Sequence, residues 1–91
     1  MTTQEIANRL VELCRQGDYT KVYQELYAPN CVSIEPKGAP NEVCNGLEEM
    51  AAKGKAWNES MLEFHGSSVG EPIVAEDHFS VTMMMDATFK D

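Results

Sequence analysis

The chain of 91 residues has room for one domain and not for two, and we place that domain over residues 1–91. Fifteen acidic residues against seven basic ones give a net charge of −8, which argues against binding to nucleic acid or to an anionic membrane surface. The sequence holds no apolar run near the ~20 residues that cross a bilayer, and its first five residues lack the basic region of a signal peptide. Cys14, Cys31 and Cys44 are odd in number and lack metal-binding spacing, so we expect reduced thiols in the cytoplasm.

The first predicted element is an amphipathic helix that begins after Thr2. Thr2 and Glu5 have the spacing of a capping box, in which each side chain accepts from the other residue's backbone N–H. Apolar residues then recur on one helical face, at Ile6, Leu10, Leu13 and Cys14. Gly17 supplies the left-handed backbone conformation that commonly ends a helix, so the first helix should end there.

A second, shorter helix should follow at once, because Asp18 can cap it. Its apolar positions fit the helical period throughout: Tyr19, Val22, Tyr23, Leu26 and Tyr27. Pro29 removes a backbone donor and disfavours helical conformation in the residue before it, so we expect the helix to stop near Ala28. With almost no linker between them, the two helices should turn sharply at Gly17 and pack on each other.

A strand, a loop and a third helix are predicted next. Residues 31–35 alternate and are rich in β-branched side chains, which is typical of a strand. The turn-forming residues 37–41 indicate a loop, and residues 42–44 are a candidate short extended segment. Asn45 and Glu48 have the spacing of an N-cap and its partner, and the helix should end within residues 58–60. One face of this helix carries Leu47, Met50, Ala51, Gly54 and Trp57.

The remainder of the chain predicts a long β-hairpin. Its first strand spans residues 61–74 and should be loosened by Gly66, Gly70 and Pro72, with a bulge expected near Gly70. Residues 75–77 form the turn, and residues 78–90 alternate so regularly that they predict the clearest strand in the chain. One face of that strand carries Phe79, Val81, Met83, Met85, Ala87 and Phe89.

Several short motifs occur in a fixed order along the chain. They are Gly17-Asp18, Leu26-Tyr27-Ala28, the run from Val32 to Pro36, the run from Asn45 to Glu48, Trp57, and Phe79-Ser80-Val81 leading to the run from Met85 to Thr88. In this order they resemble the SnoaL-like branch of the nuclear-transport-factor-2-like, or ketosteroid isomerase-like, superfamily. The resemblance implies a cone-shaped, barrel-like α+β fold in which three helices pack on a curved antiparallel sheet.

The resemblance also sets an expectation for the end of the chain. Members of this family normally continue for two more strands, to a total of ~110–140 residues, which is within the usual range for a domain. The strand over residues 78–90 would otherwise be a long apolar edge. A shortened sequence, strand exchange between two chains or a tight dimer would each resolve this, and we favour missing C-terminal strands. Dimers are common in the superfamily, so a homodimer is also expected.

The fold implied by the resemblance has a pocket between the concave face of the sheet and the helices. The residues expected to line it are Leu10, Tyr23, Trp57, Phe64, Phe79 and Met83. A mostly apolar pocket of this kind suits a small apolar ligand. The alternative is that the same side chains only form the core of a thin domain.

Glu35, followed by Pro36, is the candidate catalytic residue. It resembles the Asp-Pro pair of ketosteroid isomerases, in which the carboxylate is the general base. Desolvation raises the pKa of a carboxylic acid in an apolar cavity, which suits such a group to moving a proton next to a carbonyl. Alternation along the strand puts Glu35 opposite Val32 and Ile34, so Glu35 faces water if those two residues face the core. The oxyanion donors of the isomerases have no recognised counterpart, because Leu10 stands where they carry a tyrosine.

Three functions stay open at this point. The first is an isomerase or polyketide cyclase-like enzyme that acts on an apolar carbonyl compound with Glu35 as its base, the second a non-catalytic ligand-binding domain, and the third a dimerising interaction module. No cofactor is expected, because the chain has no phosphate loop and no dinucleotide fingerprint. No metal site is expected either, because His65 and His78 lie too far apart along the hairpin to share an ion.

Overall fold

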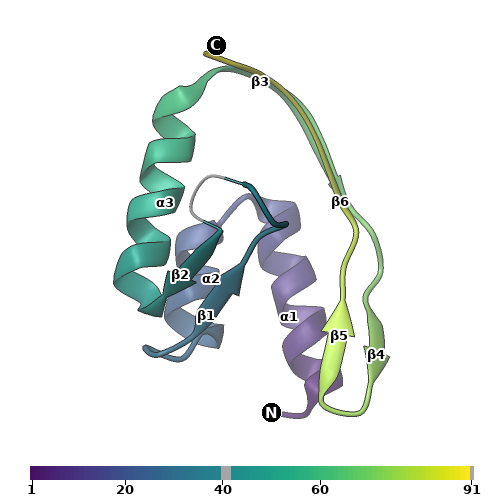
Figure 1. Cartoon of the computed structure of the whole chain (residues 1–91). Helices are drawn as coiled ribbons and strands as arrows, with labels where there is room; N and C mark the ends of the chain where they lie inside the picture. The colour runs from purple at the N-terminus through teal and green to yellow at the C-terminus, as the bar shows by residue number, and fades with distance from the viewer. Residues whose placement is uncertain (40–41, 91) are drawn as a thin grey trace.

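The computed structural model describes residues 1–39 and 42–90 and has the predicted α+β composition (Figure 1). Its elements in chain order are α1 (Thr3–Gln16), α2 (Tyr19–Leu26), β1 (Val32–Ile34), β2 (Val43–Asn45), α3 (Gly46–Ser60), β3 (Met61–Val69), β4 (Ile73–Ala75), β5 (His78–Ser80) and β6 (Met83–Phe89). Three helices and antiparallel strands were therefore predicted correctly. In the described residues the strands form three two-stranded ladders, β1–β2, β3–β6 and β4–β5, where one curved sheet was expected.

The two ends of α1 form as the sequence predicts. Thr2 Oγ1 accepts from the backbone N–H of Glu5 at 3.1 Å, and Glu5 Oε1 accepts from the backbone N–H of Thr2 at 3.0 Å, which completes the capping box. Gly17 ends the helix in the left-handed region at φ 76°, and its N–H donates to the carbonyl of Cys14 at 3.1 Å. These contacts satisfy backbone groups that helix ends leave without partners.

The second helix starts where predicted and ends earlier than predicted. Asp18 caps it by accepting from the backbone N–H of Lys21 at 3.2 Å. The helix stops at Leu26, since Tyr27 is already extended at φ −98° and ψ 134°. The N–H of Cys31 donates to the carbonyl of Ala28 at 3.0 Å, so a tight turn begins at Ala28, where the prediction ended the helix.

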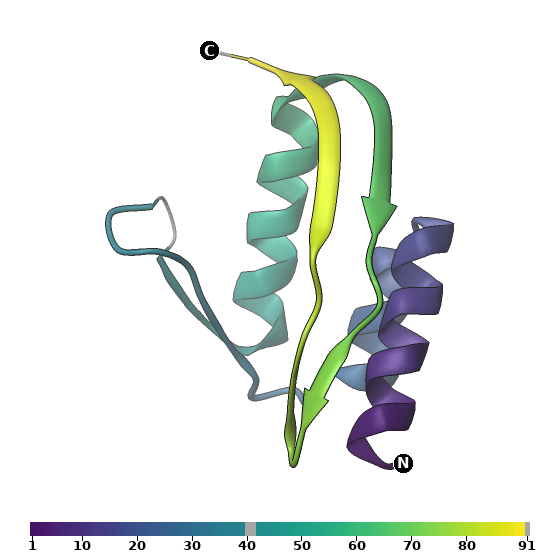
Figure 2. The same ribbon diagram turned by 90° about the vertical axis from the view of Figure 1, so that its right-hand side faces the viewer.

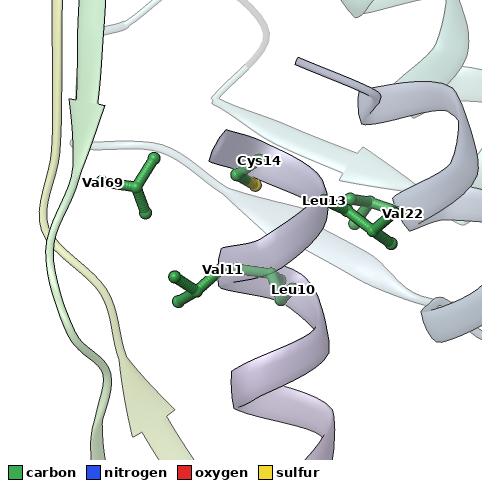
Figure 3. Close-up of a cluster of buried hydrophobic side chains, with 6 residues drawn as sticks. All are labelled: Leu10, Val11, Leu13, Cys14, Val22 and Val69. Carbon is green, nitrogen blue, oxygen red and sulfur yellow. The ribbon is translucent and has the colours of Figure 1, made fainter. Parts of the chain in front are cut away.

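The core lies where α1 packs between α2 and the long hairpin (Figure 3). Its buried members are Leu10, Val11, Leu13, Cys14, Val22 and Val69, and half-buried Leu26, Tyr27, Phe79 and Val81 pack against them. Leu13 is the most deeply buried large side chain, with 1% of its surface exposed. A core this small leaves α3 to be held mainly through its contacts with β1, β2 and β3.

The third helix forms with a different cap from the one predicted. Asn45 is its N-cap residue, but the Asn45 side chain makes no capping hydrogen bond. The backbone N–H of Asn45 instead donates to Glu49 Oε1 at 3.0 Å, so Glu49 takes the place that the prediction gave to Glu48. Gly46 begins the helix at φ 85°, a left-handed conformation that glycine adopts readily.

The long hairpin arches from the end of α3 to the side of α1 (Figure 1), and Figure 2 shows its two ladders as one curved ribbon. Each predicted strand is split in two, because pairing stops after Val69 and resumes at Ile73. The interruption contains Gly70, whose N–H donates to the carbonyl of Thr82 at 2.9 Å. A break was therefore placed correctly at Gly70. Register also shifts between Phe64 and Gly66, where Gly66 was expected to loosen the strand, and between Met61 and Glu63, which was not predicted.

Candidate functional site

A pocket with a volume of about 790 Å³ lies between α2, the inner face of the β1 segment, α3 and the beginning of β6. Its walls are mostly apolar and are formed by Tyr23, Tyr27, Ser33, Glu35, Ala39, Met50, Lys53, Gly54, Ala56, Trp57 and Met83. This volume is within the ~300–1,000 Å³ typical of small-molecule sites. Three of the predicted lining residues, Tyr23, Trp57 and Met83, come together here with Glu35.

Glu35 lines this pocket because the strand before it turns its apolar side outward. Val32 and Ile34 are 53% and 76% exposed. Ser33 and Glu35 alternate with them and lie on the opposite, pocket-facing side. The N–H of Glu35 donates to the carbonyl of Glu42 at 2.7 Å, which continues the β1–β2 pairing and fixes the backbone at this position. The alternation itself was predicted, and the structure shows which of its two faces meets the helices.

Lys53 is a charged pocket residue that the sequence prediction did not name. Its Nζ donates to Glu35 Oε1 at 2.8 Å and to Ser33 Oγ at 3.1 Å. The Lys53 side chain is only 23% exposed, whereas that of Glu35 is 42% exposed. The hydrogen bond to Glu35 raises the pKa of Lys53, so Lys53 is an ammonium cation at neutral pH. The sequence suggested that Glu35 is an isolated acid in an apolar cavity. In the structure Glu35 is instead part of a charged cluster with Lys53.

A sequence signal for Lys53 did exist. Lys53 follows Met50 by three residues and precedes Trp57 by four, so all three lie on one face of α3. A lysine within an otherwise apolar helical stripe needs an anionic partner when that stripe is covered. Without knowledge of which strand covers α3, the partner could not be chosen among fifteen acidic residues.

The aromatic walls of the pocket are held by contacts with one another. The rings of Tyr23 and Tyr27 meet edge to face with their centroids 5.2 Å apart. Burial raises the pKa of the Tyr27 hydroxyl, which therefore stays protonated at neutral pH. At the other end of the pocket, Trp57 lies 5.3 Å from Phe89 between ring centroids. These contacts give the pocket two fixed aromatic sides.

The other predicted lining residues lie elsewhere. Leu10 is buried in the core, and Phe79 packs against that core from the hairpin. Phe64 is exposed and lines a second pocket of about 520 Å³, shared with Tyr19, Trp57 and Met85. Trp57 borders both pockets and stands between them.

The two histidines lie outside both of these pockets. His65 Nε2 is 2.9 Å from Thr88 Oγ1, across the β3–β6 ladder. His78 Nδ1 is 2.7 Å from its neighbour Asp77 and is highly exposed. Within residues 1–39 and 42–90, no group of three histidine, cysteine or acidic side chains is arranged to hold a metal ion. None of the helices in the same residues has the length and apolar character needed to cross a membrane.

Comparison with known proteins agrees with this architecture. The family described as "SnoaL-like domain" matches residues 1–91. A crystal structure from Mesorhizobium loti, whose name describes a candidate SnoaL-like polyketide cyclase and adds the label carbohydrate phosphatase, superimposes with a TM-score of 0.91 at 36% sequence identity. The match covers 99% of this chain and 76% of that one. None of the curated proteins matches the chain. The family match over the full length, supported by the structural superposition, shows that this chain belongs to the SnoaL-like domain family.

Proposed function

We propose that this chain is an enzyme that moves a proton on a small apolar carbonyl compound, as an isomerase or a polyketide cyclase does, with Glu35 as the base. The observation that carries the proposal is that Glu35 lies on the wall of a mostly apolar pocket of about 790 Å³. Apolar walls with few polar groups select an apolar ligand and orient it by those groups. A positioned carboxylate next to an acidic C–H is the arrangement that general-base catalysis requires.

The name of the M. loti relative supports the cyclase side of this proposal. Its second label, carbohydrate phosphatase, fits the pocket less well. Among the described lining residues Lys53 is the one cation, and it is already paired with Glu35. The chain also carries a net charge of −8, so both local and long-range electrostatics disfavour a phosphate group.

The second candidate is a ligand-binding domain without catalysis, and a specific contact favours it. Glu35 Oε1 is engaged by Lys53 at 2.8 Å, so the carboxylate has a partner before any substrate arrives. A homodimer is proposed for either function on the family resemblance. Size-exclusion chromatography with light scattering tests it, and a monomer at high protein concentration would contradict it.

The test uses β,γ-unsaturated ketones of one and two rings, whose isomerisation to the conjugated ketone increases ultraviolet absorbance. Glu35 would take the proton from the carbon between the two double bonds, and the same proton would return to the far carbon of the alkene. We expect Glu35→Gln to lower the rate by about 10²–10⁴-fold. Glu63→Gln is the matched control, because Glu63 lies on β3 and is 70% exposed.

Three outcomes separate the candidates. A rate that survives Glu35→Gln would refute Glu35 as the base. Absence of catalysis by the wild type, together with ligand-dependent NMR shifts at Tyr23 and Trp57, would establish the binding-domain candidate instead. Absence of both catalysis and binding would refute the pocket itself as a site for apolar ketones. Thermal melts of both variants exclude loss of folding as the cause of a lost rate.

A further inference from the structure

We propose that Lys53 is the oxyanion donor of this site, with its ammonium group holding the carbonyl oxygen of the ligand while Glu35 moves the proton. This inference rests on the function proposed above and adds a second catalytic residue to it. The sequence prediction assigned no residue as oxyanion donor, because Leu10 stands where the isomerases carry their donor tyrosine. The structure places Leu10 in the buried core. Because a leucine side chain carries no hydrogen-bond donor, another residue must supply one if enolate chemistry occurs.

The spacing of the two charged groups fits one carbonyl unit. Lys53 Nζ and Glu35 Oε1 are 2.8 Å apart. In a ketone, the α-carbon and the carbonyl oxygen are about 2.4 Å apart by standard bond lengths. A carboxylate and an ammonium group at this separation can therefore face the α C–H and the carbonyl oxygen of the same molecule.

The proton transfer balances with these two residues alone. The proton passes from the α-carbon to the Glu35 carboxylate, and the electron pair of the C–H bond forms the enolate double bond. The π electrons of the carbonyl move to its oxygen, which becomes negative next to the Lys53 ammonium. The proton then returns from Glu35 to the far carbon of the alkene: the alkene pair forms the new C–H bond, the enolate pair moves to give the conjugated double bond, and the oxygen re-forms the carbonyl, so the step needs no oxidant or reductant. The Lys53 ammonium keeps its proton throughout, because it stabilises charge by hydrogen bonding.

Lys53 has a donor left for this purpose. An ammonium group carries three N–H donors. Glu35 and Ser33 take one each in the hydrogen bonds of 2.8 and 3.1 Å. These two bonds hold the side chain against the pocket wall, so the remaining donor is presented with little loss of side-chain freedom. Because the contact with Glu35 raises the pKa of Lys53, the group acts as a charged donor and not as a nucleophilic amine.

Tyr23 is the competing donor, since it also lines the pocket and carries a hydroxyl. Its hydroxyl is neutral, whereas the Lys53 ammonium brings a full positive charge next to the developing oxyanion in addition to its hydrogen bond. Lys53 also contacts the proposed base directly, and no such contact joins Tyr23 to Glu35 among the described interactions. These two differences favour Lys53.

The test uses 2-naphthol, whose phenolic oxygen mimics an enolate oxygen, and 2-methoxynaphthalene, which has the same rings and cannot ionise. Dissociation constants are measured by fluorescence at a pH below the pKa of free naphthol, and the absorbance of the bound naphthol reports its ionised fraction. The proteins are the full chain, Lys53→Met, Glu35→Gln and Tyr23→Phe. Lys53→Met keeps the apolar stem of the side chain and removes only the charge.

We expect the wild type to prefer naphthol over its methyl ether by about tenfold to a hundredfold, the range for a hydrogen bond to a charged group. Lys53→Met should abolish this preference while binding of the methyl ether stays unchanged. Glu35→Gln should increase the ionised fraction of bound naphthol, because Lys53 is then no longer neutralised. Tyr23→Phe should leave the preference in place.

Each other result counts against the inference in a distinguishable way. Equal binding of both probes, unaffected by Lys53→Met, would overturn the donor role and leave the apolar pocket standing. Loss of the preference in Tyr23→Phe and not in Lys53→Met would assign the donor to Tyr23. Failure of both probes to bind the wild type would overturn this inference and the proposed function together.

Discussion

The substitution Gly54→Ala should stabilise the protein, and its size follows from the structure. Gly54 lies inside α3, where glycine costs about 1 kcal/mol relative to alanine because of its backbone entropy. A Cβ added at Gly54 would lie 4.0 Å from the hydroxyl of Tyr23, an ordinary van der Waals distance that needs no rearrangement. We therefore expect an increase of about 1 kcal/mol in the free energy of unfolding, or roughly 4–8 °C in Tm for a domain of this size.

The matched control is the same chemical change at Gly17. A Cβ there meets nothing within 4 Å, so space is not at issue, but Gly17 holds the left-handed conformation at φ 76°. Alanine in that conformation costs about 1–2 kcal/mol, so Gly17→Ala should lower Tm. Circular dichroism melts of both variants should therefore move in opposite directions. A lower Tm for Gly54→Ala would refute the reasoning and show that the close approach of Tyr23 to α3 requires glycine.

Three further substitutions test the core, the helix cap and a surface ion pair. Leu13→Ala should lower the free energy of unfolding by about 3 kcal/mol in denaturant melts, since Leu13 is fully buried; the same change at Leu62, which is 62% exposed, should cost less than about 0.5 kcal/mol. Thr2→Ala removes the capping box and should cost about 1 kcal/mol in the same assay, and no change would show that the cap is frayed in solution. The hydrogen bond from Arg9 lowers the pKa of Glu25, so Arg9→Gln should raise the Glu25 pKa towards its ordinary value in an NMR titration. The stabilising contribution of this pair in the wild type should be lost as pH falls through the lowered pKa of Glu25, and an unchanged titration would refute the contact.

The parts of the fold that the sequence predicted well are those set by neighbouring residues. The capping box of Thr2 and Glu5, the Asp18 cap and the left-handed Gly17 each depend on residues within four positions of one another. Local contacts of this kind form in the same way whatever lies across the core. The boundaries of α1 and the beginning of α2 were therefore predictable without any tertiary information.

The break in the long hairpin coincides with a contact from a residue far away in the sequence. The carbonyl of Val69 accepts from the Arg15 guanidinium, at 2.9 Å from Nη2 and 3.2 Å from Nε. The same guanidinium pairs with Glu71 at 3.0 Å, so α1 holds the segment just where β3 ends. Gly70 predicted an irregularity there, but strand periodicity carries no information about a helix 54 residues earlier. This contact lies at the point where the two ladders separate.

The candidate site was predicted only in part, because its remaining features depend on contacts between elements that are distant in the sequence. Tyr23 and Trp57 lie on helical faces that the apolar period identified, and the family resemblance implied that these faces line a pocket, where the structure has both residues. The direction of the Glu35 side chain depends on which face of its strand the helices cover. Alternation separates the side chains into two faces but does not show which face is covered. Lys53 was missed because its partner comes from another element, 18 residues earlier in the chain.

The orientation of the β1–β2 hairpin is itself an argument for a functional inner face. Hydrophobic burial favours turning Val32 and Ile34 towards the helices, yet these side chains face outward and are largely exposed, as is Val43 opposite Ile34. The inner face instead presents Ser33 and Glu35 to Lys53. The outward apolar face agrees with the homodimer proposed above, in which a second chain would cover Val32 and Ile34. The inner face keeps a carboxylate and an ammonium group on the pocket wall, and departures from local burial rules concentrate at functional sites.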